Sequence, residues 1–155
     1  MEIKATLNKP YTNEQRINFI LEQNHRTGYE IRETELALEA WGYTEEEKEK
    51  QKRERIAKLH LTRGDVFRGL LLARQVTRAQ IRALIEAMPE ETPEQAMAKE
   101  YALIDFDESL DFYRGVALID TLGEQLGISS EAMTQFFETN DYHYLIPDTR
   151  NKEEE

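Results

Sequence analysis

Four carboxylates in the second half of the chain have a spacing that resembles a metal-binding loop. The segment 105–111 reads Asp-Phe-Asp-Glu-Ser-Leu-Asp. A calcium-binding EF-hand loop requires glycine at its sixth position and glutamate at its twelfth. Counted from Asp105, those positions hold Leu110 and Val116, so the pattern fails. We interpret the carboxylates as the solvated face of a helix and predict no metal site.

Other catalytic motifs are missing from the sequence. There is no Cys, which excludes disulfides, thiolate zinc ligands and thiol nucleophiles. His25, His60 and His143 lack the spacing of metal ligands, and we find no Gly-rich phosphate loop or nucleophile elbow. Acids are so abundant that a paired-carboxylate site remains an open alternative, although no pair stands out. We predict a protein that is not an enzyme, with no cofactor and no small-molecule substrate.

One region of the chain is basic, and it offers a candidate binding surface. Its arginines are Arg63, Arg68, Arg74, Arg78 and Arg82. Arg74, Arg78 and Arg82 are spaced by four and would align on one continuous helix, but Thr77 is expected to break it. One hypothesis makes this region an anchor for an acidic protein or for phosphate. The favoured one pairs these arginines with the carboxylate excess elsewhere in the protein.

Residues 119–138 follow the outline of a helix-turn-helix, with Gly127-Ile128-Ser129 between two helices. A helix that reads DNA needs Arg, Lys, Asn or Gln facing the groove, and phosphate contact dominates its affinity. Residues 116–146 contain no Lys or Arg, but they contain Asp120, Glu124, Glu131, Glu138 and Asp141. We therefore expect an ordinary helix corner and regard nucleic acid as an unlikely partner.

The single tryptophan, Trp41, is a second candidate contact residue. It is flanked by Ala40 and Gly42. Tryptophan is enriched at the centre of protein interfaces, which makes Trp41 a candidate anchor for a partner. The alternative, which we favour, is that Trp41 fills the edge of a hydrophobic core.

The composition predicts a strongly anionic, soluble protein. The net charge is -11, with 33% charged and 39% hydrophobic residues, so the protein should repel nucleic acid and anionic membranes. The N-terminus lacks the basic and apolar regions of a signal peptide. No apolar run is longer than Leu70-Leu71-Leu72-Ala73, far short of the ~20 residues that cross a bilayer. We expect a cytoplasmic location and no membrane partner.

The 155 residues suit one domain with an appendage, and the pattern predicts a mainly α protein. Residues 1–43 are expected to form an arm, a helix that starts at a Thr12–Gln15 capping box, and then either a short β-hairpin or a helix over Glu33–Trp41. Residues 44–60 form a charged spacer helix with little to pack against, which is compatible with an elongated or oligomeric form. Residues 61–146 form a helical bundle, and residues 147–155 a disordered tail.

The bundle is expected to contain about five short helices. Capping residues predict helix starts at Thr62, Thr77, Thr92 and Ser129, and another helix is expected over Val116–Leu126. The helix from Thr92 is expected to run to Tyr113 with its apolar residues at helical spacing. These residues are Met97, Tyr101, Ile104 and Leu110.

Four segments resemble parts of small uncharacterised proteins encoded by bacteriophages and prophages. They are Lys9–Gln15, Glu39–Thr44, Leu61–Phe67 and Asp111–Gly115. The resemblance covers the chain from about residue 9 to residue 146. Such proteins are often encoded near tail and other structural genes, and no activity defines them. The resemblance therefore implies a context and no mechanism.

These observations lead to a functional hypothesis. The chain is expected to be a non-enzymatic phage or prophage accessory protein that acts through protein–protein contacts. It would be a tail-region structural component or an assembly factor, present in the bacterial cytoplasm or in the virion. Its expected partners are phage structural proteins or a second copy of itself. The alternative is a nucleic-acid-associated regulator that uses the Arg63–Arg82 region.

Overall fold

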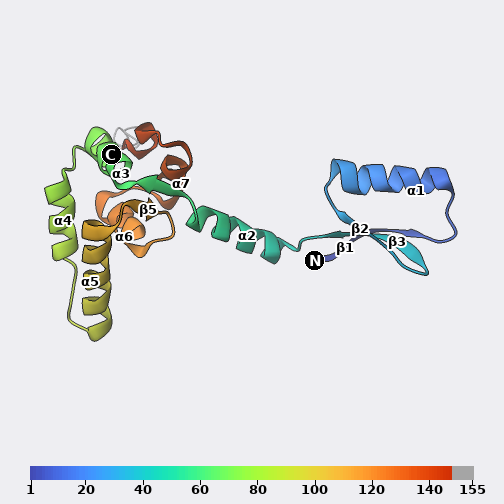
Figure 1. Ribbon diagram of the computed structural model, residues 1–155, viewed down its shortest axis with the longest axis horizontal. Helices are drawn as coiled ribbons and strands as arrows, with labels where there is room; N and C mark the ends of the chain where they lie inside the picture. Colours follow the sequence, from blue (N-terminus) through green and yellow to red (C-terminus); the bar gives the residue numbers. More distant parts are fainter. Residues whose placement is uncertain (148–155) are drawn as a thin grey trace, which may run out of the picture. The chain divides into compact units, whose positions relative to one another are not determined.

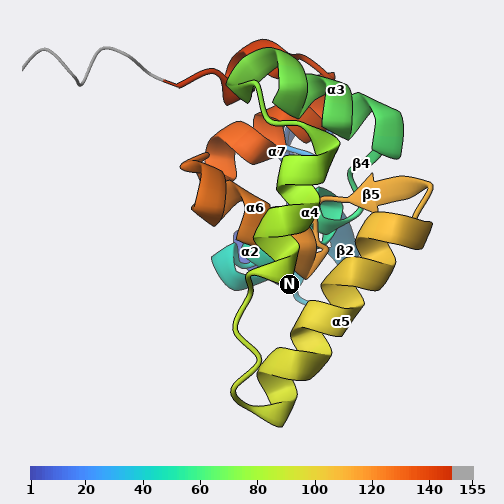
Figure 2. The same ribbon diagram turned by 90° about the vertical axis from the view of Figure 1, so that its left-hand side faces the viewer.

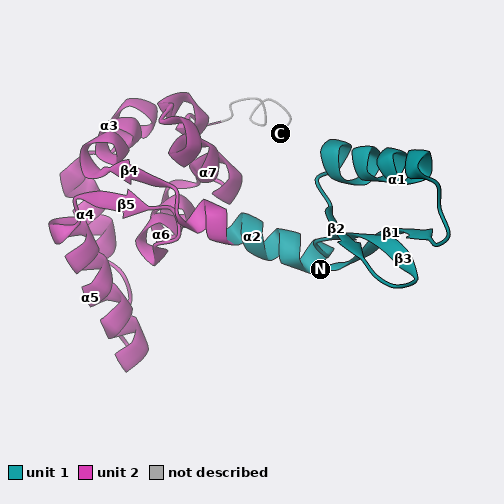
Figure 3. Ribbon diagram, turned by 45° about the vertical axis from the view of Figure 1, so that its right-hand side comes forward, with its two compact units in different colours: residues 1–53 teal, residues 54–155 magenta. Residues whose placement is uncertain are grey.

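The computed structural model describes residues 1–147, and the chain divides into two compact units (Figures 1 and 3). The N-terminal unit ends at Arg53 and the C-terminal unit begins at Glu54, inside helix α2 (Glu45–Ala57). Helix dominates the described secondary structure, so the prediction of a mainly α protein is confirmed. The predicted tail lies, from residue 148 onward, outside the described residues.

The N-terminal unit is a three-stranded antiparallel sheet with a helix on one face (Figure 1). Its strands are β1 (Glu2–Asn8), β2 (Glu30–Glu33) and β3 (Ala37–Gly42), in the order β1-β3-β2. The helix α1 (Asn13–Ile20) continues as a π-helical turn, η1 (Leu21–Arg26). β2 and β3 form the hairpin that was one of two alternatives for residues 29–43, because their apolar residues alternate with period two.

The core of this unit is small. The residues buried in it all belong to β3, and they are Ala37, Leu38, Ala40 and Gly42. Gly42 is required for packing, because a Cβ there would lie 2.8 Å from the ring of Tyr29. The apolar residues of α1 and η1 are only partly covered: Ile17 is 52% exposed and Leu21 47% exposed.

The C-terminal unit packs five α-helices around one hydrophobic core (Figure 2). They are α3 (Arg63–Arg74), α4 (Arg78–Glu86), α5 (Pro93–Glu108), α6 (Ala117–Leu126) and α7 (Ser130–Thr139), followed by the 3-10 turn η2 (Tyr142–Leu145). Fully buried side chains at the centre include Leu70, Ile81, Ile85, Ile119 and Phe136.

Within residues 1–147, every helix falls short of the length and apolarity that a bilayer crossing requires.

The predicted helix from Thr92 to Tyr113 is wrong at its C-terminal end. α5 ends at Glu108, and the backbone is extended at Ser109. Asp111–Tyr113 instead forms β5, which pairs with β4 (His60–Thr62) and places Phe112 opposite Leu61. Phe112 is buried in that pairing at 2% exposure. A helix that continued to Tyr113 would not pair Phe112 with Leu61. The burial of Phe112 in this pairing therefore explains why α5 ends at Glu108.

Candidate interaction surfaces

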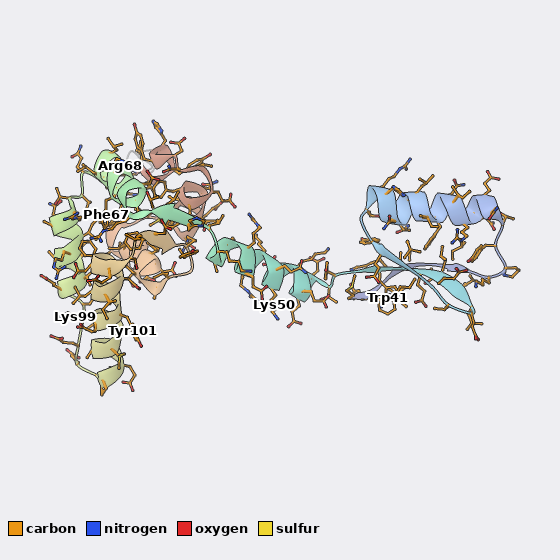
Figure 4. All side chains as sticks on the ribbon, in the orientation of Figure 1. Trp41, Lys50, Phe67, Arg68, Lys99 and Tyr101 are labelled. Carbon is orange, nitrogen blue, oxygen red and sulfur yellow. The ribbon has the colours of Figure 1, made fainter. Side chains whose placement is uncertain are left out.

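Trp41 lies on the sheet face of the N-terminal unit that α1 does not cover (Figure 4). Neighbouring residues of a strand point to opposite faces, so Ala40 faces α1 and Trp41 faces away. The register places Ile3 directly opposite Trp41, on the same face. Ile3 is 48% exposed and Met1 37% exposed. We call Met1, Ile3 and Trp41 the Trp41 face.

Charged groups of both signs hold the indole in place. The Arg32 guanidinium lies 4.5 Å from the centroid of the Trp41 ring. The indole Nε1 donates to Glu39 Oε2 at 2.9 Å, and Arg32 Nε donates to Glu30 Oε1 at 2.9 Å. The indole is therefore half-buried with its N–H satisfied, and the role of Trp41 as a contact anchor stays a prediction.

The five arginines do not form one stripe. α3 ends at Arg74, Gln75 adopts φ 57°, and α4 begins at Arg78, so Arg74, Arg78 and Arg82 are not on one helix. Thr77 caps α4, as predicted. The break removes the four-residue alignment on which the stripe depended.

Arg63 and Arg82 both bind Asp107 of α5. Arg63 Nη1 donates to the Asp107 carbonyl at 2.8 Å, and Arg82 Nη1 forms an ion pair with the Asp107 carboxylate. Arg82 Nε also donates to Glu86 Oε1 at 3.1 Å. The Asp107 carboxylate raises the pKa of the Arg82 guanidinium. Both guanidinium groups lie within 6 Å of the Phe106 ring centroid, at 5.7 and 5.9 Å.

Arg74 links three parts of the C-terminal unit. Its Nε donates to the Leu145 carbonyl at 2.6 Å, and its Nη1 donates to the Leu126 carbonyl at 3.0 Å. It therefore satisfies free carbonyls at the ends of α6 and η2. Partial burial lowers the pKa of this guanidinium. Arg68 pairs with Asp65 on its own helix, whereas Arg78 has no ion pair or side-chain hydrogen bond within residues 1–147.

The predicted helix-turn-helix outline is present in α6, Gly127–Ser129 and α7. Gly127 adopts φ 69°, and the Ser129 hydroxyl accepts from the Ala132 N–H at 3.1 Å. A buried arginine that sequence reasoning missed, Arg114, fixes this corner. Its Nη1 donates to Asp120 Oδ1 at 2.6 Å and its Nη2 to Ser130 Oγ at 2.9 Å. The guanidinium is thus engaged by the protein itself.

α5 exposes an apolar stripe that sequence reasoning had identified as helical periodicity without recognising it as a surface. Met97, Tyr101 and Ile104, which we call the α5 stripe, are 58%, 62% and 48% exposed. The buried positions of α5 are Ala102 and Phe106 instead. The helix therefore has apolar residues on two faces, and only one of these faces packs into the core.

A hollow of about 320 Å³ borders the α5 stripe, between α5 and α6. Its lining includes Ala98, Tyr101 and Asp105 from α5, Ala117 and Thr121 from α6, and Met88 from the α4–α5 connection. We call this hollow the α5 groove. The three-residue stripe and the groove share Tyr101, so together they make one continuous surface.

The surroundings of the α5 groove are acidic. The segment 86–111 contains nine carboxylates and a single basic residue, Lys99. Lys99 pairs with Glu90 at 3.4 Å, and it lies on the opposite side of α5 from Tyr101 (Figure 4). The groove side of the helix thus carries carboxylates without a lysine or arginine from α5.

Within residues 1–147, no group of three or more histidine and acidic side chains is arranged to hold a metal ion. Comparisons of the chain with protein-family models, with curated proteins and with solved structures found no match.

Proposed function

We propose that the chain is a non-enzymatic phage or prophage accessory protein that acts by binding other proteins, as a tail-region structural component or an assembly factor. The observation that carries the binding function is that each unit has an exposed apolar face of its own: the Trp41 face in one and the α5 stripe in the other. The phage context rests on the sequence resemblance of the four segments.

Exposed apolar side chains that gather in patches mark interaction sites more often than isolated ones do. Trp41 is positioned by Arg32 and Glu39, so little side-chain entropy would be lost when a partner covers it. The N-terminal unit also buries few residues of its own, and contact with a partner would extend its small core.

The described acids with shifted pKa values lie in ion pairs and hydrogen bonds on the surface. Each described carboxylate with a shifted pKa has it lowered, and these acids are Glu30, Glu33, Glu45, Glu47, Asp65 and Asp141. Lowered values are typical of surface ion pairs and hydrogen bonds.

The alternative, a nucleic-acid-associated regulator, receives less support. Four of its five arginines already make ion pairs or hydrogen bonds within the unit, which leaves Arg78 as the remaining cation. Binding that depends on these arginines would weaken steeply with salt and would be lost in the triple variant Arg74→Ala, Arg78→Ala, Arg82→Ala.

Co-purification with defined partners tests the proposal. The full chain would be co-expressed with each virion structural protein of the phage that encodes it, and complexes would be measured by size exclusion with light scattering. We expect a stable complex with at least one tail-region protein, weakened by Trp41→Ala or by Ile104→Ser. The matched control, Tyr144→Ala, changes an aromatic residue that is 42% exposed and lies outside both surfaces.

Binding to nucleic acid without any protein complex would overturn the proposal. If the folded chain forms no complex with any of these proteins, and its salt-sensitive partner is DNA or RNA, then the regulator hypothesis replaces it.

A further inference from the structure

The α5 stripe has the spacing of a helix-recognition surface. Met97, Tyr101 and Ile104 occupy positions i, i+4 and i+7, so they line one side of α5 over about 10 Å. In Figure 2 the N-terminal end of α5 and the α4–α5 connection project beyond the other helices of the unit. A partner segment can therefore lie along this side without meeting another helix of the same unit.

Three alanines belong to the lining of the α5 groove. Ala98 of α5 and Ala117 of α6 line it at exposed positions, next to the larger Met88 and Tyr101. The buried residues of the lining are Ala102 and Leu118. Small lining residues leave room for a side chain from a partner between the two helices, and methionine adapts its shape to the group that enters. The volume, about 320 Å³, suits an inserted bulky side chain better than a large ligand.

The negative charge around the α5 stripe favours a positively charged partner. Glu94, Glu100, Asp105 and Glu108 each lie three or four residues from a member of the stripe, on the same part of the helix surface. None of the four forms an ion pair within residues 1–147. The other acid at this end of α5, Asp107, is already bound by Arg63 and Arg82.

We propose that the α5 groove binds a basic amphipathic helix of a partner protein, and this inference rests on the proposed binding function. Apolar side chains at i, i+4 and i+7 of the partner pack against Met97, Tyr101 and Ile104, as in other helix-in-groove complexes. One apolar side chain enters the groove. Flanking lysines or arginines pair with Asp105, Glu100 and Glu108, whose charges are uncompensated.

A labelled peptide of about 18 residues serves as the probe, because shorter isolated helices are marginal in water. It carries Leu, Phe and Leu at i, i+4 and i+7, with lysines on the remaining positions of one face. A scrambled peptide of identical composition carries the same charge without the apolar stripe. The affinity of the full-length chain for each peptide is measured by fluorescence anisotropy at about 0.15 M ionic strength. At this ionic strength, interactions between exposed charges are screened beyond about 8 Å.

Three variants of the protein test the geometry separately from its charge. Ile104→Ser removes a member of the stripe, Ala98→Phe fills the groove, and Asp105→Asn removes one carboxylate. Leu110→Ser is the matched control, because Leu110 is 83% exposed and lies outside the groove lining. Circular dichroism and the thermal midpoint of each variant confirm that it is folded.

We expect the amphipathic peptide to bind at least about tenfold more tightly than the scrambled one, and Ile104→Ser and Ala98→Phe each to weaken it about tenfold, as for a central apolar anchor. Asp105→Asn should weaken binding more at low salt than at high salt. Equal affinities for the two peptides, or a Leu110→Ser effect as large as that of Ile104→Ser, would overturn the inference. If the protein is instead a dimer that Ile104→Ser dissociates, and the peptide fails to dissociate it, the surface binds a second copy of the chain.

The same variants separate this inference from the proposed function. If a tail-region protein binds the chain and Ala98→Phe leaves its affinity unchanged, the groove assignment fails while the binding function stands. If the peptide binds the groove but no virion protein binds the chain, the phage role fails and the groove assignment stands.

Discussion

Arg114 and Asp120 form an ion pair of 2.6 Å at the corner between β5 and α6, and the arginine side of it is almost fully buried. The same guanidinium donates to the Thr134 hydroxyl at 3.1 Å and to Ser130, so it also holds the start of α7. One side chain thereby connects two helices and the strand before them. Arginine suits this position because its planar group presents several donors in fixed directions.

Replacing Arg114 should destabilise the C-terminal unit. Arg114→Met keeps the aliphatic length but leaves Asp120, Ser130 and Thr134 without their donor. Because the Asp120 side chain is 59% exposed and water can hydrate it, we expect a loss of about 1–2 kcal/mol in unfolding free energy. Arg114→Lys should recover only part of this, because an ammonium cannot reach all three partners. Urea unfolding followed by circular dichroism measures both. A loss below about 0.5 kcal/mol for Arg114→Met would contradict the structural role.

The two units should unfold in separate transitions. Trp41 is the single tryptophan and lies in the N-terminal unit, so its fluorescence reports that unit alone, while the helical circular dichroism signal reports mostly the C-terminal unit. Because the N-terminal unit buries so few residues, its midpoint should lie at lower urea concentration.

Two core substitutions give the matched test of this independence. Leu38→Ala should shift the fluorescence midpoint and leave the dichroism midpoint in place, and Ile85→Ala should do the reverse, each with a loss of about 2–5 kcal/mol in its own unit. Coincident midpoints in the wild type and both variants would show one cooperative transition instead.

The start of most helices was predictable because helix capping is local. Thr12, Thr77 and Thr92 each accept a hydrogen bond from the backbone N–H three residues later, with glutamine completing the capping box. Ser129 caps α7 in the same way without the returning side chain. These signals need four consecutive residues and no knowledge of tertiary packing.

Other features depended on packing and were beyond the sequence pattern. α5 has two apolar faces, and only the packing of the other helices decides that Phe106 is buried, with its ring centroid 5.4 Å from that of Phe67 in α3, while Tyr101 is exposed. The strands β4 and β5 are three residues long, too short for a periodic signal, and they pair Leu61 with Phe112 across a large sequence separation. Arg114 gave no signal beyond being an isolated cation among acids.

The hydrogen bond between Tyr11 and Glu33 should make the N-terminal unit sensitive to pH at both extremes. The Tyr11 hydroxyl donates to Glu33 Oε1 at 2.7 Å, which lowers the pKa of Glu33 and raises the pKa of Tyr11. A lowered carboxyl pKa contributes stability that is present above the ordinary value of 4.5 and is lost as pH falls below it. A raised tyrosine pKa contributes stability that is present below 10.0 and is lost as pH rises above it.

Tyr11→Phe tests this linkage directly. The variant should raise the pKa of Glu33 toward its ordinary value, although the Lys9 ammonium, 3.2 Å from the carboxylate, still lowers it in part. An NMR titration of the Glu33 carboxyl carbon measures the change, with Glu35 as the internal control on the neighbouring turn. An unchanged Glu33 titration would show that the hydrogen bond is not formed in solution.

Gly69 and Phe136 should be coupled through a close contact between α3 and α7. A Cβ on Gly69 would lie 2.5 Å from the Phe136 ring, which is itself only 1% exposed. Gly69→Ala gains about 1 kcal/mol of helix propensity, yet the clash should make it destabilising by about 1–3 kcal/mol overall. Gly64→Ala on the same helix is the matched control, because its nearest neighbour is the flexible end of Arg68 at 3.3 Å. Phe136→Leu frees the space, so adding Gly69→Ala to it should cost less than in the wild type; strictly additive effects would show that the two residues do not touch.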